Sequence, residues 1–146
     1  MSAESFFLML NVIAGIGWLA LLILSPFWKF TDKFVIGIII VLLAILYSFF
    51  NFGHIAEAGG PASFMTFEGV LKVFSNPWLI NAGWAHIMAF DLLAGVWIKN
   101  NAAKNGISYW IVIPVLLVTI MLAPLGFLIY QLIRWIKTKQ YFASIG

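Results

Sequence analysis

Two titratable side chains in the third apolar stretch of the chain have the types and spacing to do chemistry inside a membrane. His86 and Asp91 lie five residues apart between Pro77 and Lys99, in a stretch that is otherwise apolar apart from Asn81. A charged residue at the centre of a spanning helix costs about 2.5–3.5 kcal/mol on insertion scales, and such residues usually serve function. The alternative is that Asp91 is protonated or paired and holds helices together.

The spacing of these two residues limits what they can do jointly. Five residues correspond to about 140° around a helix and about 7.5 Å along it. His86 and Asp91 therefore cannot form the direct pair that a spacing of three or four allows. A carboxyl and an imidazole are suited to general acid and base roles. We expect both side chains to be buried within a helix bundle. There they either contact one ligand at two different depths in the bilayer or each interact with a different neighbouring residue.

The composition places the chain in a lipid bilayer. Of its 146 residues, 64% are hydrophobic and 9% are charged, with a mean hydropathy of +1.06. Soluble domains do not reach such values. The net charge of +3 comes from lysines that flank the apolar segments, which excludes a basic surface for nucleic acid. The chain has no cysteine, so disulfides and thiolate metal sites are excluded.

The apolar runs predict an all-α, polytopic protein that forms a single domain over residues 1–146. Each run is about as long as the 20 residues that cross a bilayer, and backbone groups in lipid are satisfied only in helices or closed barrels. The fourth run contains Pro114, Pro124 and Gly126, and we expect it to be kinked or tilted. The four predicted transmembrane helices cover residues 5–28, 34–52, 78–98 and 108–133.

An interfacial helix is predicted between the second and third spans, over residues 63–75. Phe67, Val70, Leu71 and Phe74 recur at the spacing of one helix face. Such an amphipathic helix lies in the plane of the membrane surface. This helix either covers a site as a lid or only rests at the membrane surface, and the sequence leaves both roles open.

Polar residues are expected to gather in the half of the bilayer nearest the N-terminus, as a funnel with Asp91 at its floor. Basic residues divide four to four between the two faces, so the positive-inside rule does not orient the chain. The first hairpin favours the Lys29 and Lys33 side as cytoplasmic, with both termini outside. The residues assigned to this funnel and its rim are Asn11, Asn51, His54, Glu57, Glu68, Asn81, His86, Gln131 and Arg134.

Several kinds of site are excluded. No lysine lies inside a span, which excludes a retinal Schiff base. His54 and His86 differ in depth by roughly 12 Å, too much for a shared haem or metal. Phosphate-loop, dinucleotide and nucleophile-elbow motifs are missing from the sequence. We therefore expect no cofactor and no metal.

The third and fourth runs also carry a recognisable pattern. The sequence reads Gly83-Trp-Ala-His86-Ile-Met-Ala-Phe-Asp91-Leu-Leu-Ala-Gly95-Val-Trp97, and later Ala123-Pro-Leu-Gly126. In these motifs and over nearly its whole length the chain resembles the abscisic-acid-deficient-four-like family of small four-helix membrane proteins. It departs from the family at Ile87, where tyrosine is common, and at Ala123, where glycine is usual.

The resemblance implies an intramolecular isomerase of the neoxanthin synthase type, because plant members of the family are required to make neoxanthin from violaxanthin. That conversion needs an acid for the epoxide oxygen and a base for a vinylic proton, and Asp91 and His86 are the candidates for the two roles. Polar and apolar walls for a xanthophyll or related isoprenoid would come from Asn11, Asn81, Trp84, Phe90, Phe127 and Tyr130.

A second hypothesis belongs to a different class. In it the chain is a non-catalytic carotenoid-binding or accessory subunit, alone, as a homo-oligomer or in a larger membrane complex, and Asp91 and His86 only hold helices together. In both hypotheses we expect an integral protein of a bacterial inner membrane whose partners are lipid and an isoprenoid.

Overall fold

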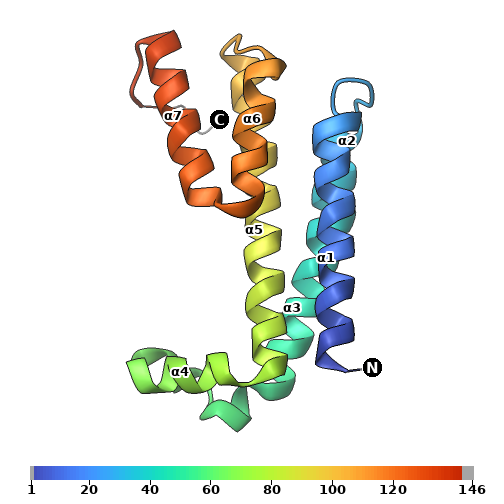
Figure 1. The fold of residues 1–146 in the computed structure, drawn as a ribbon, viewed down its shortest axis with the longest axis vertical. Coiled ribbons are helices and arrows are strands. Elements are labelled where there is room, and N and C mark those ends of the chain that lie inside the picture. The colour runs from blue at the N-terminus through green and yellow to red at the C-terminus, as the bar shows by residue number, and fades with distance from the viewer. Residues whose placement is uncertain (1, 143–146) are drawn as a thin grey trace.

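The computed structural model describes residues 2–142 and is helical throughout its regular structure (Figure 1). Helix α1 (Ala3–Leu19) continues into the π-helical turn η1 (Ala20–Leu24), and α2 (Thr31–Phe34), η2 (Val35–Ile40) and α3 (Val41–His54) form a second continuous helix. The third long helix is α5 (Pro77–Lys104). These three helices are long and apolar enough to cross a bilayer, which confirms the first three predicted spans with shifted ends.

Helix α5 is the centre of the structure, and the other long helices pack against it through small residues. A Cβ added to Gly95 would lie 2.9 Å from the Trp18 ring, and one added to Gly17 would lie 3.0 Å from Leu92 and Ile39. Membrane helices associate through such close contacts because lipid supplies no hydrophobic driving force between them. The start of α5 is fixed by Pro77 and by the Asn76 side chain, which accepts the Trp78 and Leu79 N–H groups.

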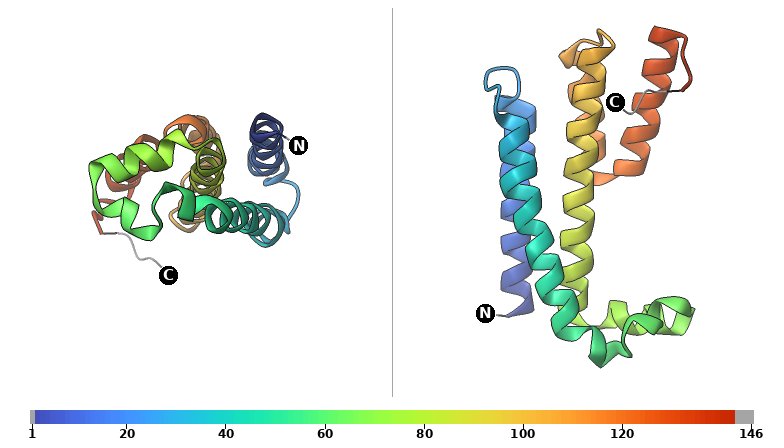
Figure 2. Two further views of the ribbon diagram at one scale, coloured as in Figure 1. Left: turned by 90° about the horizontal axis from the view of Figure 1, so that it is seen from below. Right: turned by 180° about the vertical axis from the view of Figure 1, so that it is seen from behind.

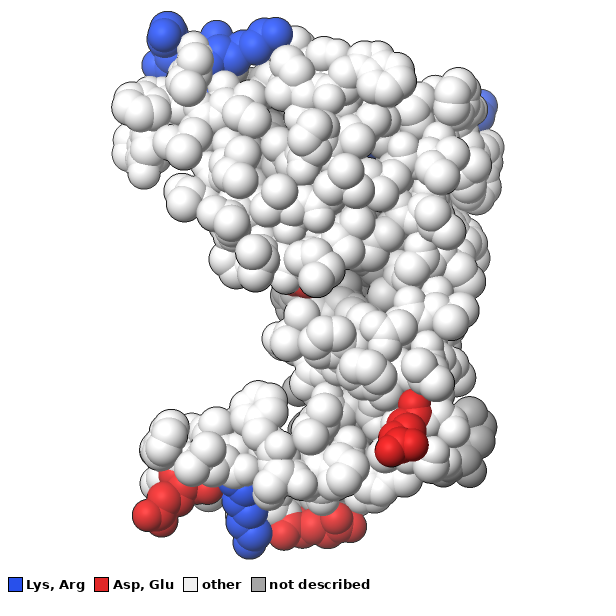
Figure 3. All heavy atoms as spheres, viewed as in Figure 1, with Lys and Arg blue, Asp and Glu red and all other residues white. Residues whose placement is uncertain are grey.

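The predicted interfacial helix is α4 (Phe67–Ser75), and it extends sideways from the lower end of α5, away from α1 and on the side of α7 (Figures 1 and 2). Thr66 caps it by accepting the Gly69 N–H. Phe67, Leu71 and Phe74 are exposed along one side. Figure 3 shows acidic and basic atoms on the surface of this segment that faces away from the rest of the molecule. This arrangement suits a helix whose apolar side rests in lipid and whose charged side meets water.

The prediction of a fourth full span is wrong. Residues 109–138 form two helices, α6 (Tyr109–Met121) and α7 (Ala123–Thr138), separated by Leu122 with φ −144° and ψ 69°. Pro124 follows the break and cannot donate to the preceding turn. The chain then reverses, so α6 descends beside α5 only part of the way and α7 returns (Figures 1 and 2). The prolines were expected to kink one helix, but the segment folds into a hairpin.

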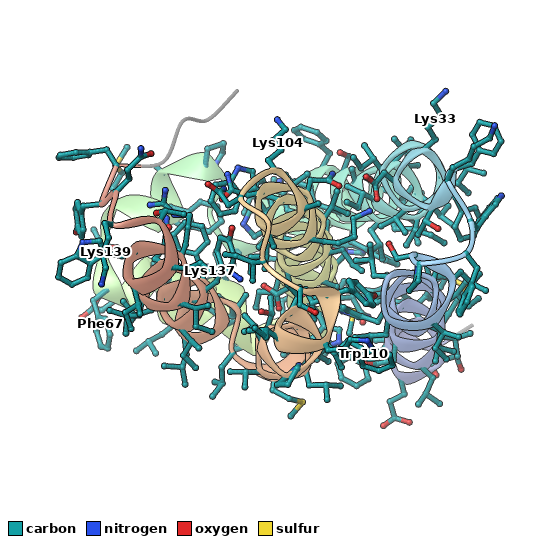
Figure 4. The ribbon with its side chains drawn as sticks, turned by 90° about the horizontal axis from the view of Figure 1, so that it is seen from above. Lys33, Phe67, Lys104, Trp110, Lys137 and Lys139 are labelled. Carbon is teal, nitrogen blue, oxygen red and sulfur yellow. The ribbon has the colours of Figure 1, made fainter. Side chains whose placement is uncertain are left out.

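This reversal moves the C-terminal basic residues to the opposite end of the molecule from that predicted. Seven of the eight basic residues lie at the end where α5 and α7 finish and α2 begins, while Lys72 lies beyond the other end in α4. Figure 4, seen from above, labels Lys33 beside α2, Lys104 beside α5, and Lys137 and Lys139 beside α7, and Figure 3 shows acidic atoms mainly at the other end. The expected four-to-four tie is therefore wrong. The seven are Lys29, Lys33, Lys99, Lys104, Arg134, Lys137 and Lys139.

Candidate functional site

Asp91 lies at the middle of α5, fourteen residues after Pro77 and thirteen before Lys104. At 1.5 Å per residue, the carboxylate is about 20 Å from either end of the helix. The side chain is partly exposed. Within residues 2–142 it makes no hydrogen bond or ion pair, unlike Asp32, which pairs with Lys99 and accepts from Asn100. The carboxyl group is therefore free of the interhelical bonds that a purely structural role requires.

Helix α5 borders a hollow in the side of the molecule. Figure 3 shows this hollow between the α4 segment and the mass formed by α6 and α7, with acidic atoms just visible at its upper edge. Asp91 is the acidic residue of α5. The hollow exists because α6 and α7 turn back at Leu122, which leaves the lower half of α5 uncovered on that side. A ligand dissolved in the bilayer can enter it sideways.

His86 is exposed, so the expectation that it is buried in the bundle is wrong. Its ring packs 4.8 Å from the Phe90 ring and 5.6 Å from the Tyr47 ring, measured between centroids. The prediction assumed that residues 108–133 run past the lower half of α5 and cover His86. The chain instead reverses at Leu122, so that α7 returns toward the end of the molecule where α5 finishes. The structure does not bring His86 and Asp91 together, because they lie about 140° apart around α5.

The asparagines of the predicted site connect α1 to α5. The Asn11 Oδ1 accepts the Trp84 Nε1–H at 3.3 Å, and its Nδ2 donates to the Phe7 carbonyl at 2.8 Å. The Asn81 Nδ2 donates to the Ala3 carbonyl at 2.9 Å, while its buried Oδ1 has no partner among the described residues. Asn11, Asn81 and Trp84 thus support the helix pair, and the polar funnel predicted around them is filled by these contacts.

A groove of about 1010 Å³ lies higher up, between α5, α7 and the segment that follows α7. Its walls are aliphatic and aromatic, and Trp97 packs 5.2 Å from Phe127 at its back. Of the residues predicted to bind substrate, Phe127 lines this groove and Phe90 is exposed beside His86. The lining residues are Leu93, Ala94, Trp97, Pro124, Phe127, Leu128, Gln131, Leu132, Trp135, Tyr141 and Phe142.

Tyr130 lies behind the groove in a buried polar cluster that the sequence did not reveal. Its hydroxyl donates to the Asn101 Oδ1 at 2.5 Å. One turn further along α7, the buried Arg134 donates from Nε to the Gln131 Oε1 at 2.9 Å and from Nη2 to the Tyr141 carbonyl. The signal that could have found this cluster was the spacing of three and four between Tyr130, Gln131 and Arg134, which puts them on adjoining helix faces.

No group of three metal-ligating side chains occurs among the residues that the structure describes. His54 is used locally, since its Nδ1 lies 3.2 Å from the Glu57 Oε1 and its ring stacks on Trp78 at 5.3 Å. Glu57 in turn accepts from the Asn76 side chain at 2.9 Å. This cluster closes the end of the bundle beside α4.

The family model of ABA DEFICIENT 4-like proteins matches residues 5–130. The chain belongs to the ABA4-like family. The match covers Asp91, the reversal at Leu122 and Tyr130, and it ends one residue before Gln131. No curated protein matches the chain. No solved structure matches it either.

The family match confirms the resemblance inferred from the motif around His86 and Asp91. It links this ABA4-like protein to a family that is associated with neoxanthin synthesis. The match and the three long apolar helices together place the protein in a lipid bilayer.

Proposed function

We propose that this ABA4-like protein is a membrane-embedded isomerase that acts on a xanthophyll or related isoprenoid, with Asp91 as the acid–base residue. The observation that carries the proposal is the partly exposed Asp91 carboxyl at the middle of α5, which has no hydrogen bond or ion pair within residues 2–142. The same helix borders the hollow in the side of the molecule. A carboxyl that holds helices together would be bonded to a neighbouring helix, as the side chains of Asn11 and Asn81 are.

The chemistry requires two proton transfers and no redox cofactor. When an epoxide opens to an allenic alcohol, an acid protonates the epoxide oxygen as the adjacent carbon–oxygen bond breaks. The neighbouring vinylic carbon loses a proton, and the electron pair of that bond forms the second double bond of the allene. The substrate gains and loses one proton, so substrate and product are isomers. Each proton transfer is general acid or base catalysis.

Asp91 can supply both transfers. A protonated carboxyl donates from one oxygen and accepts at the other, and it ends the cycle in the state in which it began. This assignment suits the geometry better than a shared role with His86, because the two residues lie about 140° apart on α5 and cannot both touch one epoxide ring. The apolar surroundings of the hollow exclude water, which would otherwise compete for the opened epoxide.

The test is pigment analysis in a violaxanthin-producing bacterial host that expresses the full chain. We expect an isomer with an allenic end group to accumulate. Asp91→Asn should be present in the membrane at the parent level and convert about 10²–10⁴-fold less, which is the size of general acid–base help. Glu68→Gln is the matched control, since it makes the same chemical change at an exposed position of α4. Equal conversion by Asp91→Asn and the parent would contradict the mechanism.

The non-catalytic alternative predicts a different outcome of the same experiment. An accessory or carotenoid-binding subunit would retain pigment during purification without changing it, and Asp91→Asn would retain pigment equally well. The free carboxyl favours the isomerase, because binding an apolar polyene gives no use for an acid at the centre of the bilayer.

A further inference from the structure

We infer that a second, smaller groove between η2 and α5, which we call the Lys104 groove, binds one anionic phospholipid through its phosphate. The Lys104 groove has a volume of about 270 Å³ and lies between Ile36 of η2 and the α5 residues from Leu93 to Lys104. It opens at the lysine-rich end of the molecule, where α5 finishes and α2 begins. The inference is independent of the isomerase, because it involves neither Asp91 nor the reaction.

The upper end of the Lys104 groove provides a free cation. Lys104 is exposed and makes no ion pair within residues 2–142, whereas Lys99 is paired with Asp32. Of the five acidic residues in the sequence, Asp32 is the one at the lysine-rich end. No side-chain carboxylate among the described residues therefore neutralises Lys104, and a phosphate at the membrane surface can do so. Basic pockets between membrane helices on the cytoplasmic side bind lipid headgroups in this way.

Asn101 adds a buried hydrogen-bond donor to the same end of the groove. Its side chain is 8% exposed and lines the Lys104 groove. The Asn101 Oδ1 accepts from the Tyr130 hydroxyl at 2.5 Å and from the Asn105 Nδ2 at 3.1 Å, and Asn105 is itself oriented because its Nδ2 also donates to the Asn101 carbonyl at 2.7 Å. These bonds fix the orientation of the Asn101 amide. Its Nδ2 has no partner within residues 2–142 and is left to donate to a ligand in the groove.

Below these two groups the Lys104 groove is apolar, with walls that include Ile36, Leu93 and Trp97. From Lys104 to Leu93 is eleven residues, or about 16 Å of helix, and half of a typical hydrocarbon core is about 15 Å. The phosphate of a phospholipid lies at the membrane surface and its acyl chains reach the middle of the bilayer, so both the order and the length match. An uncharged apolar chain would leave the Asn101 amide without a bond, and a free phosphate would leave the apolar walls uncovered.

The test is native mass spectrometry of the delipidated full chain in detergent, with dioleoylphosphatidylglycerol or dioleoylphosphatidylcholine added. We expect one tightly bound phosphatidylglycerol per chain and weaker binding of phosphatidylcholine, whose choline cancels the charge of the phosphate. Lys104→Ala should weaken binding of phosphatidylglycerol about fivefold, which is the contribution of one basic residue near an anionic lipid surface. Lys137→Ala is the matched control, because it removes the same charge from an exposed position on α7 that does not line the Lys104 groove (Figure 4).

Asn101→Asp tests the amide donor with almost no change in shape. It keeps an oxygen to accept from Tyr130 and Asn105 but replaces the amide nitrogen by a second oxygen. Binding of phosphatidylglycerol should weaken about tenfold or more, the size of a hydrogen bond to a charged group. Should this buried variant not fold, Lys104→Ala still decides the matter, since Lys104 is exposed.

Three results would overturn the inference. The first is unchanged binding by Lys104→Ala, or a loss as large in Lys137→Ala, which would indicate attraction to the whole basic surface. The second is equal binding of phosphatidylcholine and phosphatidylglycerol. The third is displacement of phosphatidylglycerol by an equal concentration of oleate or inorganic phosphate. Asp91→Asn should bind phosphatidylglycerol like the parent, so a failure of the isomerase and a failure of this site are distinguishable.

Discussion

Gly126 of α7 lies against Thr119 of α6 so closely that a Cβ at Gly126 would be 2.1 Å from the Thr119 Oγ1 and 2.8 Å from its Cα. Thr119 is fully buried, and its hydroxyl already donates to the Val115 carbonyl at 2.8 Å. This contact fixes the two halves of the hairpin next to each other. Together with the break at Leu122, it directs α7 back toward the lysine-rich end and forms one wall of the groove.

Gly126→Ala is therefore expected to destabilise the hairpin. The added methyl cannot avoid Thr119, and overpacking of this kind costs about 1–3 kcal/mol. Gly37→Ala is the matched control, because a Cβ there meets nothing within 4 Å. The control should be neutral or slightly more stable, since alanine is the better helix former by roughly 0.5–1 kcal/mol. Thermal unfolding of both variants in the same detergent measures the difference, and equal melting temperatures would refute the close contact.

The hairpin also predicts that the C-terminal end of α7 lies on the same side of the membrane as the α5–α6 loop. The chain has no cysteine, so single-cysteine variants can be labelled without background. Ser108→Cys and Gln140→Cys should react alike with a membrane-impermeant maleimide, and Ala62→Cys should react from the opposite side; all three positions are exposed.

The positive-inside rule also predicts which end of the protein faces the cytoplasm. With seven basic residues at one end, that end is expected to be cytoplasmic. In intact cells Ala62→Cys should therefore be labelled, and the other two variants should be labelled only after lysis. Labelling of Gln140→Cys together with Ala62→Cys would show that residues 108–133 cross the membrane completely.

The sequence predicted those parts of the fold that depend on local pattern. Hydropathy alone identified α1, α3 and α5 as spans, and the spacing of Phe67, Leu71 and Phe74 identified α4. It did not predict the hairpin, because a run that is apolar throughout reads the same whether or not the chain reverses. The reversal depends on a contact between Gly126 and Thr119 that only packing reveals.

The failure to predict the reversal between α6 and α7 also explains which site residues were placed wrongly. The depth of Asp91 followed from its position in α5, whereas Asn11, which was predicted to bind substrate, bonds to Trp84 between α1 and α5. The burial of His86 and the location of Gln131 and Arg134 depended on the direction of α7, so all three predictions were wrong together. The groove between α5 and α7 could not be predicted because one of its walls is α7, which runs back along α5 only after the reversal at Leu122.

Asn11→Ala should separate helix packing from chemistry. Removing the Asn11 side chain leaves the Trp84 indole N–H without its acceptor and breaks the bond between α1 and α5. Interhelical hydrogen bonds in membranes average about 0.6 kcal/mol and reach about 1.7 kcal/mol. We expect a loss of stability in that range with pigment conversion close to the parent value, measured on the same preparation. A large loss of conversion without a loss of stability would instead place Asn11 in the substrate site.

His86→Gln distinguishes a single-carboxyl mechanism from one with a separate base. Because His86 is exposed and makes no hydrogen bond among residues 2–142, its replacement should change the free energy of unfolding by no more than about 0.5 kcal/mol, as for other exposed positions. If Asp91 supplies both proton transfers, conversion should stay within a few-fold of the parent. If His86 is the base, conversion should fall about 10²–10⁴-fold at unchanged stability. His54→Gln is the control, since it makes the same change in a histidine that contacts Glu57 and Trp78 at the end of the bundle. A selective loss of conversion in His86→Gln would therefore refute the single-carboxyl mechanism and require a substrate that reaches around α5 from Asp91 to His86.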